Sequence, residues 1–170
     1  AGNLREAILG WKKEVFRLLR DQPYCSHPPH CTLIHTEVQN EETALTEVET
    51  ILKQIKPFKL LVDHVGIFWD DAATNGHTLY VAITKDPELN ELQIHVAEAL
   101  RNTVYPTRAP AFAEINPVLK KSHENYGFPF VGPHWIPHLS IASVRTEMSD
   151  PLIAEFQSWQ PRYEHTKKWI

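Results

Sequence analysis

The chain contains one short pattern twice: a proline, a histidine, one intervening residue, a hydroxyl residue and an aliphatic residue. It occurs as Pro-His-Cys-Thr-Leu at residues 29–33 and as Pro-His-Leu-Ser-Ile at residues 137–141. Side chains at positions i and i+2 of a strand lie on one face, so each histidine is predicted to lie beside its hydroxyl residue. Only these two of the ten histidines have the pattern. A single copy would favour an ordinary polar pair on a sheet, whereas two copies in matched surroundings favour a functional pair.

Hydrophobic periodicity and turn residues predict helices and strands that alternate around the two motifs. Asn3 and Glu6 form a capping-box pattern, and Asp86-Pro87 and Asp150-Pro151 are typical helix starts. Asn75-Gly76 predicts a hairpin, and Gly66 predicts a bulge or bend in its first strand. The predicted helices cover residues 4–20, 40–56, 86–100, 118–123 and 150–159, and the predicted strands cover 30–38, 58–69, 77–84 and 136–144, with 163–170 as a candidate final strand. This order favours an α+β fold with antiparallel sheet and a rough internal duplication.

Size and composition predict one globular domain over residues 1–170, able to bury a sizeable core. The formal net charge of −4 argues against a long basic surface for duplex DNA or ribosomal RNA. No apolar run approaches the roughly 18–20 residues of a membrane span, and the first residues lack the pattern of a signal peptide. A cytoplasmic monomer that does not bind membranes is therefore the expectation.

A second interpretation concerns the cysteines. Cys25, His27, His30 and Cys31 place four potential zinc ligands within seven residues. Tetrahedral zinc sites usually take their ligands from two separated pairs, and the intervening prolines stiffen this segment. A zinc-stabilised interaction domain is thus the less favoured alternative, and it would leave the second motif unexplained.

The two motifs resemble those of the 2H phosphoesterase superfamily, in particular its 2′-5′ RNA ligase-like and 2′,3′-cyclic phosphodiesterase branch. The resemblance rests on His30-Cys31-Thr32-Leu33 and His138-Leu139-Ser140-Ile141, and it extends over nearly the whole chain. Two departures stand out: the family's opening strand would precede Asn3, and the segment 105–135 is longer than in a minimal member. The resemblance implies two pseudo-symmetric lobes of antiparallel sheet, with outer helices, flanking a central cleft.

The resemblance also implies roles for the motif residues. His30 and His138 would act as acid and base, and Thr32 and Ser140 would bind the phosphate, with no metal or cofactor. In-line displacement at phosphorus needs a base on the attacking oxygen and an acid on the leaving oxygen, and two imidazoles can divide these roles. Hydroxyl donors can stabilise the charge that develops on the non-bridging oxygens.

Loops beside the motifs contain side chains that could contact a base, ribose or phosphate. Aromatic residues in such loops can stack on a nucleobase, although they also commonly close the end of a domain. The candidates are Tyr24, Tyr126, Phe128, Phe130 and Trp135, together with His134 and Arg145 beside the second motif.

The sequence therefore predicts a metal-independent phosphodiesterase. Its expected substrate is a short RNA end with a 2′,3′-cyclic phosphate or a 2′-5′ linkage, or a small cyclic nucleotide. The alternative from another class is a non-catalytic module that binds nucleotides or RNA in the same cleft.

Overall fold

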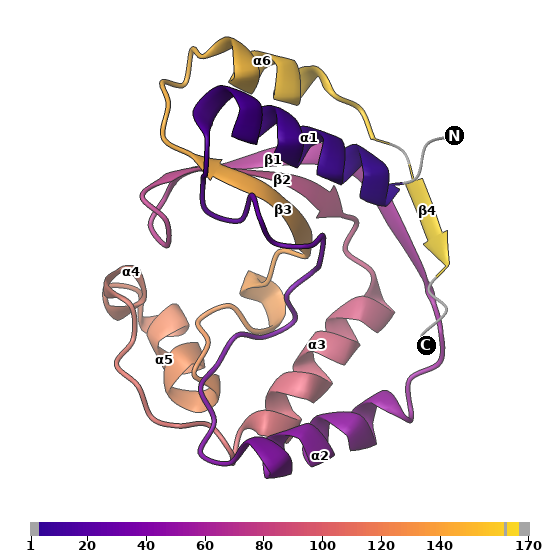
Figure 1. The fold of residues 1–170 in the computed structure, drawn as a ribbon. Helices are drawn as coiled ribbons and strands as arrows, with labels where there is room; N and C mark the ends of the chain where they lie inside the picture. Colours follow the sequence, from indigo (N-terminus) through magenta and orange to yellow (C-terminus); the bar gives the residue numbers. More distant parts are fainter. Residues whose placement is uncertain (1–3, 162, 167–170) are drawn as a thin grey trace. The chain divides into compact units, whose positions relative to one another are not determined.

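The computed structural model describes residues 4–161 and 163–166, and the predicted capping residue Asn3 lies outside this part of the chain. The α+β class is confirmed (Figure 1). In chain order the elements are α1 (Leu4–Leu19), α2 (Glu41–Leu52), β1 (Lys59–Asp71), β2 (Gly76–Ile83), α3 (Pro87–Leu100), α4 (Ala111–Glu114), α5 (Pro117–Tyr126), the 3₁₀-helix η1 (Gly132–His134), β3 (His138–Val144), α6 (Pro151–Ser158) and β4 (Tyr163–Thr166).

The helix starts predicted from the sequence are confirmed by their capping bonds. The side chain of Asn40 accepts from the backbone N–H of Thr43, and that of Asp86 accepts from the N–H groups of Glu88 and Leu89. Asp150 caps α6 in the same way. A side-chain oxygen at this position satisfies backbone donors that have no partner within the helix.

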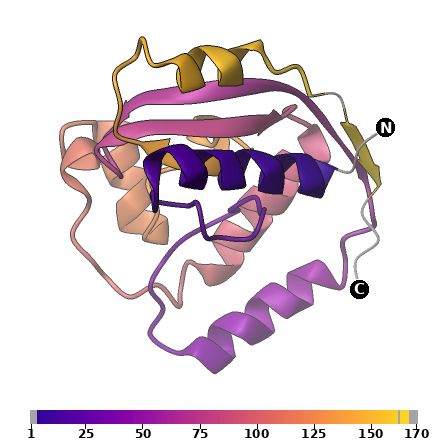
Figure 2. The same cartoon turned by 45° about the horizontal axis from the view of Figure 1, so that its top comes forward.

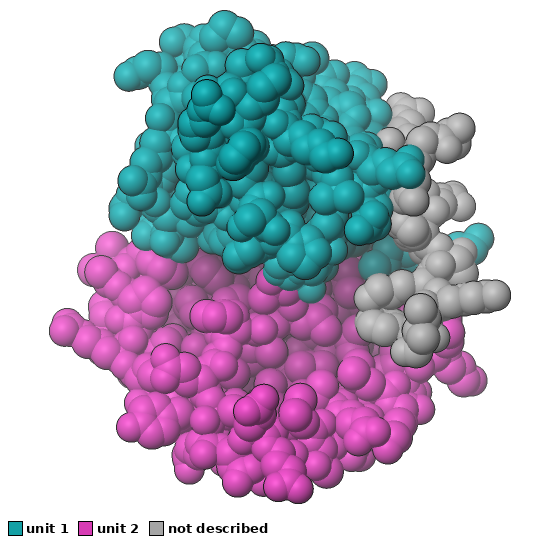
Figure 3. All heavy atoms as spheres, in the orientation of Figure 1, with its two compact units in different colours: residues 1–31, 59–84, 137–166 teal, residues 32–58, 85–136, 167–170 magenta. Residues whose placement is uncertain are grey.

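The chain divides into two compact units, which Figure 3 shows in different colours. The first comprises residues 1–31, 59–84 and 137–166, and the second comprises residues 32–58, 85–136 and 167–170. The chain passes from one unit to the other directly after Cys31 and directly before Pro137. Both motifs therefore lie at points where the chain passes between units.

The first unit is built on an antiparallel sheet with the strand order β3-β2-β1-β4. Helices α1 and α6 lie side by side along one face of this sheet (Figures 1 and 2). Trp11 of α1 contacts Phe156 of α6 edge to face, with ring centroids 5.1 Å apart. Fully buried residues between the helices and the sheet include Ile8, Val15, Leu79, Val81, Ile141, Ile153 and Phe156.

The second unit packs α2 against α3, and segment 32–38 lies beside these helices. Its core contains Ala44, Leu92, Val96 and Leu100. Leu33, the last residue of the first motif, and its neighbour Ile34 pack against this cluster. Apolar contact thus holds residues 33 and 34 within the second unit.

The prediction of a strand over residues 30–38 is wrong. This segment is irregular, and its one bridge joins Val38 to Val104. Two of its carbonyls accept from side chains: Trp135 Nε1 donates to the carbonyl of Thr32 at 3.0 Å, and Gln93 Nε2 donates to that of Leu33 at 3.1 Å. Because these carbonyls already have donors, the segment is held without a ladder.

The hairpin is confirmed, but of the predicted bulge or bend at Gly66 the bulge is wrong. The irregularities of β1 lie between Val62 and His64 and between Phe68 and Asp71, whereas Gly66 pairs regularly with Tyr80. A Cβ atom on Gly66 would lie 2.3 Å from Tyr80 Cζ. Glycine is needed here because the tyrosine ring lies directly over the strand.

We expect Gly66→Ala to lower the free energy of unfolding by about 1–3 kcal/mol, since the new methyl group forces the Tyr80 ring to move. The ring is stacked on Phe68 with centroids 4.2 Å apart, so it cannot shift without disturbing that contact. Denaturant unfolding measures the effect. Gly10→Ala is the control, because no atom lies within 4 Å of its Cβ position, and we expect it to raise stability by about 0.5–1 kcal/mol.

The same substitution in a Tyr80→Ala background separates the steric effect from a backbone effect. With the ring removed, Gly66→Ala should cost little, and the two changes should be strongly non-additive. If Gly66→Ala lowers the free energy of unfolding equally in the two backgrounds, the Tyr80 ring is not the reason why residue 66 is glycine.

Candidate active site

The second motif lies on β3, at the edge of the sheet. His138 pairs with Ala82 and Ser140 pairs with Tyr80, with no irregularity between them. The two side chains therefore lie on the same face of the strand, as the sequence predicted. The pair that follows Ser140–Tyr80 along the strands is Ala142–Leu79, so Ile141 is an additional residue in β3. This is a bulge, placed directly after the motif serine.

Two aromatic residues that the sequence reasoning missed surround the His138 ring. Its centroid lies 5.1 Å from that of Phe68 and 5.3 Å from that of Tyr80, both in edge-to-face orientation. Such pairs favour a defined ring orientation. Burial raises the pKa of the Tyr80 phenol, so the phenol is a neutral donor at physiological pH. The hairpin register was the signal that could have placed both rings beside the motif.

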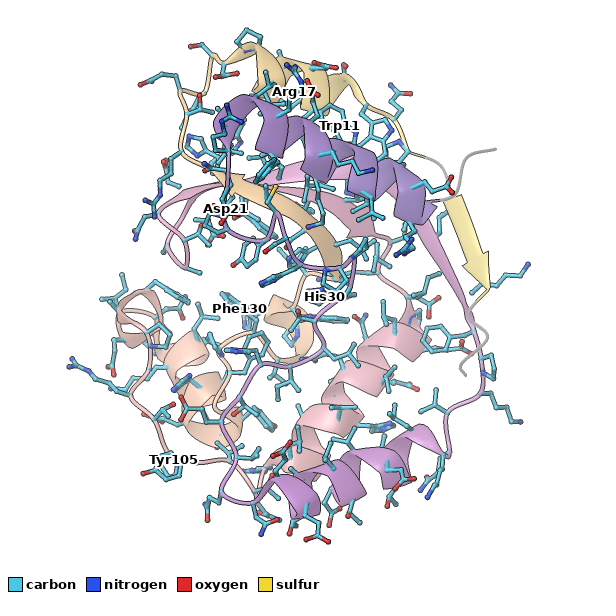
Figure 4. All side chains as sticks on the ribbon, in the orientation of Figure 1. Trp11, Arg17, Asp21, His30, Tyr105 and Phe130 are labelled. Carbon is cyan, nitrogen blue, oxygen red and sulfur yellow. The ribbon has the colours of Figure 1, made fainter. Side chains whose placement is uncertain are left out.

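His30 lies in the loop that follows α1 (Figure 4), and its side chain is exposed. Its Nδ1 lies 2.7 Å from the carbonyl oxygen of Pro28. A carbonyl can only accept, so Nδ1 carries the hydrogen and donates it. In the neutral ring Nε2 is then the basic nitrogen, and it is the one that can exchange a proton with a ligand.

The two motif hydroxyls are half-buried. Neither Thr32 Oγ1 nor Ser140 Oγ has a hydrogen-bond partner among the residues described. Each hydroxyl keeps its donor available for a ligand oxygen. His30, His138 and Ser140 belong to the first unit, and Thr32 is the first residue of the second.

The remaining predicted contact residues differ in how exposed their side chains are and in whether their polar ends already have a partner. Tyr24, Phe128 and Phe130 are half-buried, and His134 is exposed on η1. Phe130 stacks on Phe112 with centroids 5.8 Å apart, which makes an aromatic row with Phe128. The Tyr126 hydroxyl donates to Glu98, so its polar end already has a partner.

Two of these expectations are corrected by the structure. Trp135 is only 3% exposed and uses its indole N–H to hold Thr32, so it anchors the first motif and does not present a stacking surface. Arg145 follows the opposite end of β3 from His138, roughly 20 Å along the strand. It lines a hollow of about 460 Å³ with Asp70 and His77, away from the motif.

The zinc alternative finds no support. Cys25 is buried, and its thiol donates to the carbonyl of Lys12 at 3.1 Å. His30 Nδ1 is used by Pro28. Within residues 4–161 and 163–166, no group of three or more His, Cys, Asp or Glu side chains is placed to hold a metal ion.

The chain matches a known protein family over almost its whole length. The model of the 2′-5′ RNA ligase superfamily matches residues 4–167, so the chain belongs to that superfamily. Membership supports phosphodiesterase or RNA-ligase-like activity as the class of chemistry. No curated protein matches the chain. Among the residues described, no helix combines the length and apolar character needed to span a membrane.

Proposed function

We propose that the protein is a metal-independent phosphodiesterase that opens 2′,3′-cyclic phosphates at the ends of short RNAs or in small nucleotides. The observation that carries this proposal is the arrangement of the second motif. His138 and Ser140 share one face of β3, and the serine hydroxyl has no partner within the described chain. The first motif supplies the matching pair, with Nε2 of His30 and the hydroxyl of Thr32 both available.

In the proposed reaction one imidazole accepts a proton from water as the water oxygen forms a bond to phosphorus. The bond from phosphorus to one ribose oxygen breaks, and the other imidazole, protonated at the start, gives its proton to that oxygen. Thr32 and Ser140 donate hydrogen bonds to the non-bridging oxygens, where negative charge develops. The product is a ribose monophosphate, and the two histidines have exchanged protonation states.

A substrate panel tests the proposal. It contains the four 2′,3′-cyclic nucleotides and short RNAs with 2′-5′ or 3′-5′ linkages, assayed in excess chelator with His30→Ala/His138→Ala as control. We expect turnover of cyclic phosphates that survives chelation and is lost in the double variant. The absence of turnover on every member, by protein that is folded and still binds nucleotide, would overturn the proposal and favour a binding module.

A further inference from the structure

Lys12 is a lysine buried in the first unit. It lies on the inner face of α1 with Ile8 and Val15, and it is 4% exposed. No carboxylate pairs with it among the residues described. Burial lowers the pKa of its ammonium group, and the nearby Cys25 opposes this effect in part.

The ammonium group joins two backbone carbonyls that are distant in sequence. Nζ donates to the carbonyl of Tyr24 at 2.6 Å and to that of Ile141 at 2.8 Å. Ile141 is the additional residue of the β3 bulge and directly follows the motif serine. Tyr24 lies in the turn that leads to His30 and has a left-handed φ of 70°, a conformation that costs a non-glycine residue energy.

Backbone hydrogen bonds also hold the turn at Tyr24 and join it to β3. The N–H of Ser143 in β3 donates to the carbonyl of Pro23 at 2.9 Å. The Tyr24 carbonyl also accepts from the N–H of His27 at 3.2 Å. The loop before the first motif and the strand that carries the second are thus joined to one helix at one place.

Net stability does not explain a lysine at this position. Burying an ammonium group costs several kcal/mol, and replacing buried charges by apolar residues of similar volume is often neutral or stabilising. Methionine would fill the same space without that cost. What methionine cannot supply are the two donors that fix the turn at Tyr24 and the bulge at Ile141.

We propose that Lys12 is a positioning residue for the phosphodiesterase reaction, whose ammonium group fixes the bulge after Ser140 and the turn before His30 in one arrangement. The inference that Lys12 acts on catalysis rests on the proposed function. The inference that it clamps the two segments rests on its hydrogen bonds alone.

Lys12→Met tests both parts. We expect kcat on the best cyclic nucleotide to fall roughly 10- to 100-fold with KM within a few-fold, because small displacements of catalytic groups are costly. We also expect amide hydrogen exchange at Ser143 to accelerate at least about tenfold, while exchange within α3 stays unchanged. The melting temperature should stay near that of the unaltered protein or rise.

Val15→Ala is the matched control, since it removes packing from the same buried face without a polar contact. It should lower the melting temperature and leave kcat unchanged at temperatures well below unfolding. Lys12→Gln, which keeps an N–H donor, should have an intermediate kcat and serves as the test if Lys12→Met fails to fold.

The outcomes separate the two ideas. Unchanged exchange at Ser143 in a folded Lys12 variant would overturn the clamp, whatever the activity. Faster exchange with an unchanged kcat would overturn the positioning role. Faster exchange in a protein that turns over no member of the panel would support the clamp, and the failure would then belong to the proposed function.

Discussion

His138→Ala is expected to reduce kcat for the preferred cyclic phosphate by about 10²–10⁴-fold while KM changes little, and His30→Ala should do the same. The imidazole moves a proton in the transition state, so its loss lowers kcat, whereas the hydroxyl donors and ring contacts that remain in the variant can still bind the substrate. Steady-state kinetics of both single variants measure the effect. The double variant should lose little more than either single one, because acid and base act as a unit.

His95→Ala is a suitable control, since this histidine is exposed on α3, outside both motifs. It should leave kcat and KM unchanged. Circular dichroism should show that His138→Ala keeps the fold, because His138 is only half-buried. Retention of most of the activity in folded His138→Ala would remove this residue from the reaction.

The elements whose signals are local could be predicted from the sequence. Asn40, Asp86 and Asp150 each begin a helix because a short polar side chain can bond to backbone groups two or three residues away. The hairpin around Asn75 likewise depends on a few adjacent residues, and Asn75 has the left-handed φ of 56° that such turns favour. These interactions are complete within a handful of residues, so no tertiary information was needed.

The first motif segment could not be predicted in the same way. Its alternation is typical of a strand, but its carbonyls are held by Trp135 and Gln93, which are 103 and 60 residues from their respective partners. Nothing near residue 33 indicates these partners. Tertiary hydrogen bonds replaced the ladder that periodicity alone predicts.

Two polar residues did leave a usable signal. Lys12 follows Ile8 by four positions, and Gln93 follows Leu89 by four, so each stands on the apolar face of its helix. A polar residue at such a position is expected to be buried with partners. Only the structure shows which groups these partners are. They include the carbonyl of Ile141 for Lys12 and that of Leu33 for Gln93.

Lys12 and Gln93 thus have corresponding roles in the two units. Each extends from the buried face of a helix and bonds to the backbone of irregular segments. Lys12 holds the bulge after Ser140 in the first unit. In the second unit, Gln93 donates to the carbonyl of Leu33, the last residue of the first motif, and to that of Phe130 in the segment that leads to the second motif. Buried polar contacts from helices can therefore fix motif residues that lack regular secondary structure.

Gln93→Leu is expected to lower the free energy of unfolding by about 2–4 kcal/mol, because buried backbone groups without partners are costly. Gln93 is fully buried, and its Nε2 donates to the carbonyls of Leu33 and Phe130 at 3.1 and 3.2 Å. Its Oε1 accepts from the N–H of Gly132 at 3.0 Å. Leucine fills a similar volume but satisfies none of these three groups. Denaturant unfolding measures the loss.

Glu91→Ala is the matched control, since Glu91 is exposed on the same helix and should change stability by no more than about 0.5 kcal/mol. Because Gln93 also fixes the segment after His30, folded Gln93→Leu should turn over cyclic phosphate more slowly even well below its melting temperature. A loss of stability with full activity would show that Gln93 supports the second unit without positioning the motif. Unchanged stability would mean that water satisfies all three backbone groups, and the role assigned to this glutamine would then be wrong.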